Sequence, residues 1–391
     1  MSLYDRSQVP VPNMLTNARK QAEERNLYDF TIVDVDSHHY EDTSTWQTLV
    51  PYIEDDGIKA WARHQFDRQM ATRAVGAPIG DQELAGRILR GGLDVPDELR
   101  ADRHDGRNPL VARTLWAMDN LGIDYTVLFP TVMLTLGLHP QVEVEVALAR
   151  AYARWLTRDV LTRDGRIRTM VYLPFNDPAA ALRMVREFAD EPGVVGFMVT
   201  SVRYRQVHAN EYVPVYAELQ ERGMPLAFHA AYNWHDRSMG MLNKFISVHA
   251  LGFTTTNMIH LTNMVMNGIP ERFPGLKVVW VESGLAWIPF LMQRLDNEYL
   301  MRSSEAPMLT RLPSEYMRDM YYSSQPMERT AKIEVIENTF DMINAERRLL
   351  YSSDYPHWDF DTPAVIYDLP FLGEKAKRRI LGENAIELFG L

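Results

Sequence analysis

Acidic and histidine side chains follow several short apolar runs of this sequence, at the points where buried strands would end. Asp36 and His38 stand at the end of the first run, and His229, Glu282 and Asp354 end three later ones. If these ends converge, three carboxylates and two imidazoles would repel one another unless a cation lay among them. Each residue alone would be read as a solvated histidine or a capping carboxylate, but together they predict a divalent metal site.

Convergence requires elements that bring distant strand ends to one place. Short β-branched or aromatic runs alternate with helical patterns after residue 30. The expected strands are Thr31–Asp36, Tyr125–Phe129, Ile167–Leu173, Val194–Val199, Pro225–His229, Lys277–Val281, Met320–Ser323 and Arg348–Tyr351. The expected helices are Val142–Leu161, Pro178–Ala189, Val213–Arg222, Thr254–Asn267, Trp287–Met301 and a closing helix, Ala376–Leu388. This alternation favours an α/β fold, a (β/α)8 TIM-type barrel, whose functional side chains lie at the carboxyl ends of its strands.

Two segments fall outside this repeat. Residues 1–28 are expected to form an N-terminal arm, and residues 29–391 a single barrel domain. Within that domain, residues from about 50 to 112 make a long excursion between the first strand and its helix. Because the excursion follows the carboxyl end of a strand, it is placed to form part of a lid.

The composition narrows the possible functions. The chain has 391 residues, a formal net charge of −11 and no cysteine. The negative charge argues against nucleic acid or an anionic membrane surface as a partner, and the lack of cysteine excludes thiolate metal sites and a cysteine nucleophile. The N-terminus lacks the apolar core of a signal peptide, and no apolar stretch is long enough to span a bilayer. We therefore expect a cytoplasmic enzyme whose metal is bound by nitrogen and oxygen.

Several longer motifs accompany these residues. They are DSHHYE (36–41), MDNLGID (118–124), the strand ending in His229, PERFPGLKVVWVESG (270–284), SDYPH (353–357) and ILGENA (380–385). In this combination the chain, from about Val33 to its end, resembles the amidohydrolase superfamily. Within it, the chain is similar to the amidohydrolase-related branch of non-oxidative decarboxylases, which includes aminocarboxymuconate-semialdehyde and γ-resorcylate decarboxylases.

The resemblance implies a ligand set at matching positions. Asp36 and His38 match the pair on the first strand, which is often His-x-His in the superfamily, and His229 and Asp354 match the ligands of strands five and eight. Such a set suits zinc, our first choice, or manganese. The resemblance also implies a homodimer or larger homo-oligomer.

Glu282 departs from the pattern of the decarboxylases, which have a histidine at this position to serve the reacting carboxylate. An anionic Glu282 beside a substrate carboxylate would repel it. Glu282 is therefore expected to be a further metal ligand or a general acid/base. For this reason we favour a metal-dependent hydrolase of a small aromatic or carbonyl-bearing acid, with a non-oxidative decarboxylase of a hydroxylated aromatic acid as the alternative. Asp354 would accept a proton from water in the first reaction and deliver one to the ring carbon in the second.

Further residues near the predicted strand ends could serve the substrate. His249 is a candidate catalytic residue, with a structural place on a helix face as an equal alternative. The candidates for binding a flat or acidic substrate are Tyr40, Arg203, Trp234, His357 and Trp358. Aromatic residues there would make an apolar slot, and Arg203 would pair with a carboxylate.

Overall fold

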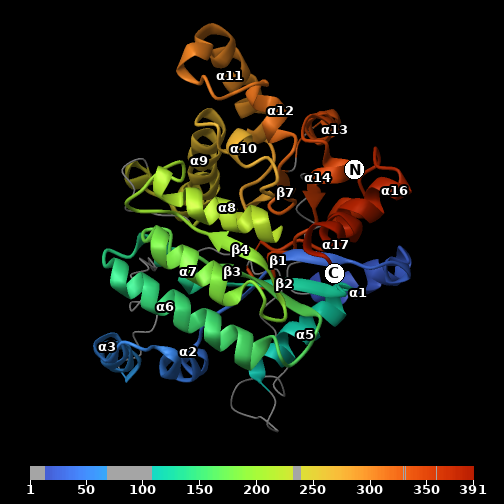
Figure 1. The fold of residues 1–391 in the computed structure, drawn as a ribbon. Helices are drawn as coiled ribbons and strands as arrows, with labels where there is room; N and C mark the ends of the chain where they lie inside the picture. The colour runs from blue at the N-terminus through green and yellow to red at the C-terminus, as the bar shows by residue number, and fades with distance from the viewer. Residues whose placement is uncertain (1–13, 68–107, 232–238, 329, 331, 358) are drawn as a thin grey trace.

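The computed structural model describes residues 14–67, 108–231, 239–328, 330, 332–357 and 359–391. Eight parallel strands form one sheet in the order β1 to β8, surrounded by helices (Figure 1). The strands are β1 (Val33–His39), β2 (Tyr125–Pro130), β3 (Ile167–Tyr172), β4 (Val194–Val199), β5 (Leu226–His229), β6 (Val278–Val281), β7 (Tyr321–Ser323) and β8 (Leu349–Leu350).

Backbone hydrogen bonds link the two edges of this sheet. The Val35 amide donates to the Tyr351 carbonyl (3.0 Å), and the Asp354 amide donates to the Asp36 carbonyl (2.7 Å). A third bond runs from the His38 amide to the Tyr355 carbonyl (2.7 Å). The first strand is thus joined to the segment that follows the eighth, and the predicted (β/α)8 barrel is confirmed. Its closure also places Asp36 beside Asp354.

The strands are apolar because both of their faces are covered. All six residues of β4 are buried, as expected for a parallel strand between a barrel interior and an outer layer of helices. From residue 109 onward, the longer described helices are α5 (Pro109–Leu121), α6 (Val142–Trp155), α7 (Pro178–Phe188), α8 (Val213–Arg222), α9 (Phe245–Met266), α11 (Trp287–Arg302) and α13 (Ile333–Met342). The chain closes with α16 (Glu374–Arg378), a π-helical turn (Arg379–Glu383) and α17 (Asn384–Phe389).

Helices α5 and α13 were not predicted, and among the predicted helices the start of α9 differs most, because it begins at Phe245 and not at Thr254. Gly252 lies inside the helix and is buried, as are Val248 and Phe253 beside it. A glycine within a helix costs only about 1 kcal/mol, which the burial of such apolar side chains offsets. Residues 245–253, which were not included in the predicted helix, therefore form its first turns.

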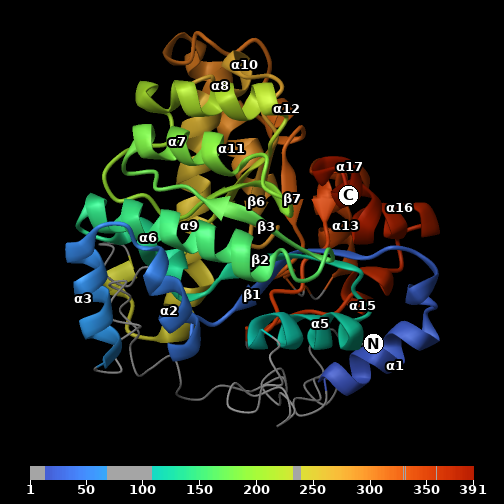
Figure 2. The ribbon, with the colours of Figure 1, turned by 60° about the horizontal axis from the view of Figure 1, so that its bottom comes forward.

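The described part of the N-terminal arm packs on its own chain. Helix α1 (Met14–Glu24) lies beside α5 (Figure 2), and Arg25 forms an ion pair of 2.7 Å with Asp368. Of the excursion after β1, α3 (Asp56–Asp67) is described and residues 68–107 lie outside the described residues. No helix in the described ranges combines the length and the apolar character needed to cross a membrane.

A buried glutamate side chain takes part in a hydrogen-bond network that connects the loops following β2 and β3. Glu145, in the first turn of α6, accepts hydrogen bonds from the Tyr172 hydroxyl (2.7 Å) and the Asn176 amide (2.8 Å). Asn176 also donates to the Gly137 carbonyl and accepts from the Tyr204 amide. Burial raises the pKa of Glu145 to about 7, although these donors oppose the shift.

The raised pKa of Glu145 predicts a pH-dependent contribution to stability. Between pH 4.5 and 7 the folded chain keeps a proton that the unfolded chain has released, so the free energy of unfolding falls as pH rises through this window. We expect Glu145→Gln to remove this contribution, about 3 kcal/mol in all. The measurement is the free energy of unfolding in urea, determined for the variant and the wild type at pH 5 and at pH 8. The difference between the two proteins should change between these pH values by about this amount. The exposed Glu143→Gln on the same turn is the control, and an equal pH response in both variants would contradict the prediction.

Candidate metal centre

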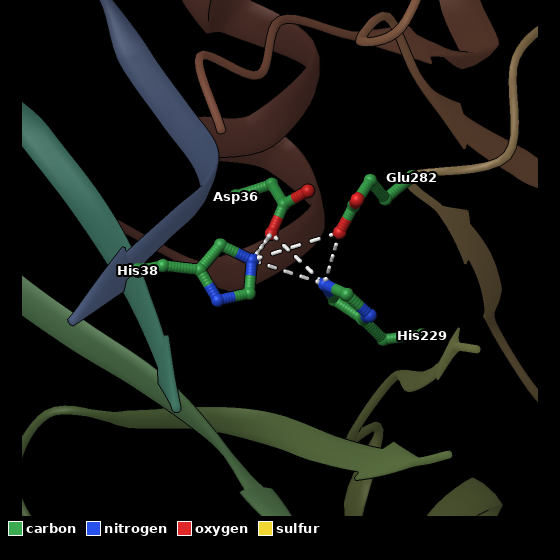
Figure 3. A group of neighbouring side chains, drawn as sticks. All are labelled: Asp36, His38, His229 and Glu282. Atoms are coloured by element: carbon green, nitrogen blue, oxygen red, sulfur yellow. Dashed lines mark hydrogen bonds and ion pairs between the residues drawn. The ribbon is translucent and has the colours of Figure 1, made fainter. Parts of the chain in front are cut away.

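Four buried side chains converge at the carboxyl ends of the strands (Figure 3). Asp36 and His38 come from β1, His229 ends β5 and Glu282 follows β6. His229 Nε2 lies 3.4 Å from Asp36 Oδ1 and 3.2 Å from Glu282 Oε2. His38 Nε2 lies 3.2 Å from Asp36 Oδ1. The structure thus brings four of the five predicted ligands together, with one ligand atom of each within 4.8 Å of every other.

The two histidine rings are oriented as metal ligands are. His38 Nδ1 lies 2.8 Å from the Pro130 carbonyl and His229 Nδ1 lies 3.1 Å from the Ala230 carbonyl. A carbonyl accepts only from a protonated nitrogen, so in the neutral rings both Nε2 atoms carry lone pairs. These two atoms face each other across 3.1 Å. Without a cation, these lone pairs would repel each other unless one ring took up a further proton. A metal ion would bind both nitrogens instead, and the carbonyls would fix the ring orientation.

The carboxylates also lack the partners that burial requires. Both oxygens of Asp36, both oxygens of Asp354 and Oε2 of Glu282 are buried and make no well-aligned hydrogen bond within the described ranges, although histidine nitrogens lie close to several of them. Burial raises the pKa of Glu282 and Asp354, and neighbouring carboxylates add to the shift. Burial lowers the pKa of His229, but Asp36 and Glu282 outweigh it and raise that pKa to about 10. A divalent cation would satisfy the orphaned oxygens and relieve the repulsion, so the residues present fit a metal ion.

Asp354 lies beside this group together with His357. His38, Glu282, Asp354 and His357 form a second set of ligand atoms within 4.8 Å of one another, which shares two members with the first. Asp354 Oδ1 lies 2.6 Å from His357 Nδ1 and 3.4 Å from His38 Nε2. The His357 ring stacks on His38 at 4.2 Å, and its Nε2 lies 3.1 Å from the Thr131 hydroxyl. His357 therefore connects Asp354 to the second strand's end.

The backbone at two of these residues is in the left-handed region. Glu282 has φ 47° and Asp354 has φ 60°, a conformation that is uncommon outside glycine and costs of the order of 1–3 kcal/mol. It is held by hydrogen bonds from the Glu282 amide to the Ser323 hydroxyl (3.0 Å) and from the Asp354 amide to Asp36. These turns bring both carboxylates to the end of the barrel.

Two residues that the sequence reasoning did not select position the ligands. Asn257 of α9 is fully buried and donates to the carbonyls of Phe228 (3.3 Å) and Val281 (3.2 Å), which precede His229 and Glu282. An uncharged amide among the apolar residues of a helix was the only sequence signal for this role. Asn257 ties the ends of β5 and β6 to one another.

Asp34 is the second such residue. Regular alternation along a strand would place it on the same face as Asp36 and His38, but the register of β1 against β2 shifts between Asp34 and Ser37. Such an irregularity interrupts the alternation of a strand. Asp34 accepts hydrogen bonds from the amide (2.8 Å) and hydroxyl of Ser353, and so holds the segment that carries Asp354.

The remaining candidates lie at different distances from this centre. The Tyr40 ring meets His357 edge to face at 5.8 Å. His249 lies half-buried on α9 between the rings of Phe245 and Phe253, and its charge is among those that lower the pKa of His357, after burial and His38.

Arg203 is exposed, donates to the Leu138 carbonyl (3.0 Å) and stacks on Tyr204. The structure does not bring it into the metal cluster. Trp234 and Trp358 lie outside the described residues.

Comparison with known proteins gives the family. A family described as amidohydrolase matches residues 101–391. The γ-resorcylate decarboxylase of Rhodococcus jostii (strain RHA1) is 22% identical over 265 residues, which cover 64% of this chain and 79% of that protein.

Two solved structures show the same fold. One, an amidohydrolase from Mycobacterium avium subsp. paratuberculosis K-10, has a TM-score of 0.68 and 19% identity, over 93% of this chain and all of that one. The other, a dihydroxybenzoic acid decarboxylase from Polaromonas sp. JS666 with bound manganese and the inhibitor 2-nitroresorcinol, has a TM-score of 0.63 and 18% identity, over 93% and 97%. The family match covers most of the chain, and the chain therefore belongs to the amidohydrolase family.

Proposed function

We propose that this protein is a metal-dependent carboxy-lyase that removes CO2 from a small hydroxylated aromatic acid without oxidation. The relatives named above support this reaction more than hydrolysis, which the sequence reasoning placed first. The observation that carries the proposal is that the Glu282 carboxylate points toward the other metal ligands. The sequence argues against decarboxylation mainly because an anionic Glu282 could repel the carboxylate of the substrate.

Glu282 faces the other ligands. Its Oε2 lies 3.2 Å from His229 Nε2 and 3.8 Å from His38 Nε2, and its side chain is almost fully buried. With a divalent cation at this point, the negative charge of Glu282 would be matched by the metal and not directed at a substrate carboxylate. The residue thus acts in the proposal as a ligand, and its presence is compatible with loss of CO2.

The metal in this proposal is held by Asp36, His38, His229 and Glu282, with Asp354 adjacent. When bound, the ion would supply the positive charge that holds the phenolic and carboxylate oxygens of the substrate. Manganese is the ion we propose first, since half of the ligands in the set are carboxylates, Asp354 adds a third carboxylate beside them, and a structural neighbour contains manganese. Zinc, the first choice from the sequence, is the alternative.

Asp354 is the proposed proton donor. Its carboxyl group is buried and lies next to the ligand set, so it can give a proton to the ring carbon that bears the carboxylate. The bond between that carbon and the carboxylate then breaks, its electron pair restores the aromatic ring, and CO2 leaves. The consumed proton returns to Asp354 from solvent through His357, whose Nδ1 lies 2.6 Å from Asp354 Oδ1.

Side chains around this pair would shape the substrate pocket. Tyr40 stacks against the edge of His357 and is 39% exposed, so it can contact both the site and a ligand entering from solvent. In the proposal Tyr40, His357 and the half-buried His249 contact the aromatic ring, with Trp234 and Trp358 as further candidates. Arg203 remains the candidate partner for a second anionic group.

A substrate panel tests the reaction. The purified protein, loaded with manganese or zinc, is incubated with hydroxybenzoates, and the expected result is release of CO2 together with the corresponding phenol, measured by chromatography. Removal of the metal by a chelator should abolish the release, and re-addition should restore it. Hydrolysis of amides or lactones without CO2 release from any hydroxybenzoate would overturn the proposal in favour of a hydrolase.

A further inference from the structure

A cavity lies at the opposite end of the barrel from the metal centre. It has a volume of about 330 Å³ and lies between the start of β6, the end of α9, α10 (Ile269–Arg272) and α12 (Pro313–Met317). This volume falls in the range of small-molecule pockets. Part of its wall is apolar, formed by Phe273, Leu276 and Met320.

The charged side chains that line this cavity are mostly cationic. The lining includes three cationic residues, Lys277, Arg311 and Arg348, and one carboxylate, Asp319. Arg311 is paired with Asp319 at 2.9 Å. Lys277 and Arg348 are half-buried, and their side-chain nitrogens make no hydrogen bond or ion pair with any residue in the described ranges. Two cationic side chains therefore have no carboxylate partner within the described part of the chain, although the formal net charge of the whole sequence is −11.

Arg348 contacts an aromatic ring, but its guanidinium has no hydrogen-bond acceptor among the described residues. Its guanidinium carbon lies 4.7 Å from the centre of the Tyr321 ring, and its Nε is buried without an acceptor. Leaving a buried donor of a charged group unsatisfied is costly. A planar guanidinium that is already positioned is suited to hydrogen-bond a carboxylate with two parallel bonds.

From these contacts we propose that the cavity binds a small organic carboxylate. The carboxylate pairs with Arg348 and Lys277, and the apolar part of the ligand lies against the wall formed by Phe273, Leu276 and Met320. The volume and the apolar wall favour an organic anion over inorganic phosphate, which would leave most of the space unfilled.

The site is separate from the metal centre. Lys277 and Arg348 precede β6 and β8, whereas Glu282 and Asp354 follow them, so the two sites lie at opposite ends of the same strands. Binding here therefore requires no metal ligand, and the two sites can be distinguished by variants.

Titration calorimetry with benzoate on the metal-loaded protein tests this site. We expect Arg348→Met to weaken one class of benzoate sites about tenfold or more, and Lys277→Met, which removes no ring contact, to weaken the same class. The exposed Arg294→Met, which loses only a pair with Glu298, is the matched control and should bind as the wild type does. Unchanged benzoate binding in both Arg348→Met and Lys277→Met would overturn the proposal.

The position of the ligand is tested directly with 4-bromobenzoate soaked into crystals. The expected result is an anomalous bromine peak in the cavity beside Arg348. A peak only beside His38 would assign the binding to the metal centre and overturn the proposal. Inorganic phosphate is titrated in parallel, and if it binds this site as tightly as benzoate, the assignment to an organic carboxylate is wrong.

Discussion

Replacement of Asp354 by asparagine is expected to lower turnover about 10²- to 10⁴-fold, the usual contribution of a general acid. Asparagine has nearly the same shape and accepts the left-handed conformation that Asp354 adopts (φ 60°), so the fold should be retained. It cannot deliver the proton that the proposed reaction requires. Turnover under saturating metal and the metal content of the purified variant are the two measurements.

The two measurements separate two roles of Asp354. If it is the proton donor, the variant keeps most of its metal and turnover stays low when metal is added in excess. If added metal restores turnover, Asp354 acts as a ligand alone and its role as the acid is wrong. Asp368→Asn, at an exposed carboxylate that pairs with Arg25, is the control and should leave turnover unchanged.

The strands could be predicted because their residue types agree with their surroundings. Val194–Val199 is apolar throughout and was predicted with its observed bounds, and each of the other predicted strands overlaps an observed one. The convergence of Asp36, His38, His229 and Glu282 then followed from topology, since every strand of a parallel barrel ends on the same side. Pattern alone was sufficient for these features.

Other features depend on interactions between distant segments, which a single sequence does not reveal. One is the register shift in β1, and another is the hydrogen bond that Asp34 accepts from Ser353, 319 residues away. The hydrogen bonds from Asn257 to the ends of β5 and β6 could be predicted only if one knew which face of α9 packs against those strands. The direction of Glu282 depends on a left-handed turn at a non-glycine residue, which residue type does not predict.

Because the Glu282 carboxylate points toward the other ligands, we expect a second large effect when it is replaced, a loss of metal affinity. Glu282→Gln should weaken metal binding by more than the 10- to 100-fold typical for loss of a partner that only orients a ligand, because it removes a charged ligand. Turnover should fall with metal occupancy and recover in part at high metal concentration. Metal affinity is measured by competition with a chelator of known affinity, and Glu298→Gln, at a residue of α11 whose side chain is 46% exposed, is the control.

Glu282→His distinguishes the role of a ligand from that of a negative charge. Histidine can donate a lone pair at the same position, and it is the residue that the resemblance to the decarboxylases implies there. If Glu282 is needed as a ligand, the histidine variant should bind metal more tightly than the glutamine variant and should still release CO2. If both variants keep full metal content but lose turnover, Glu282 acts instead through its charge or its proton. The proposed decarboxylation would then need a different account of this residue.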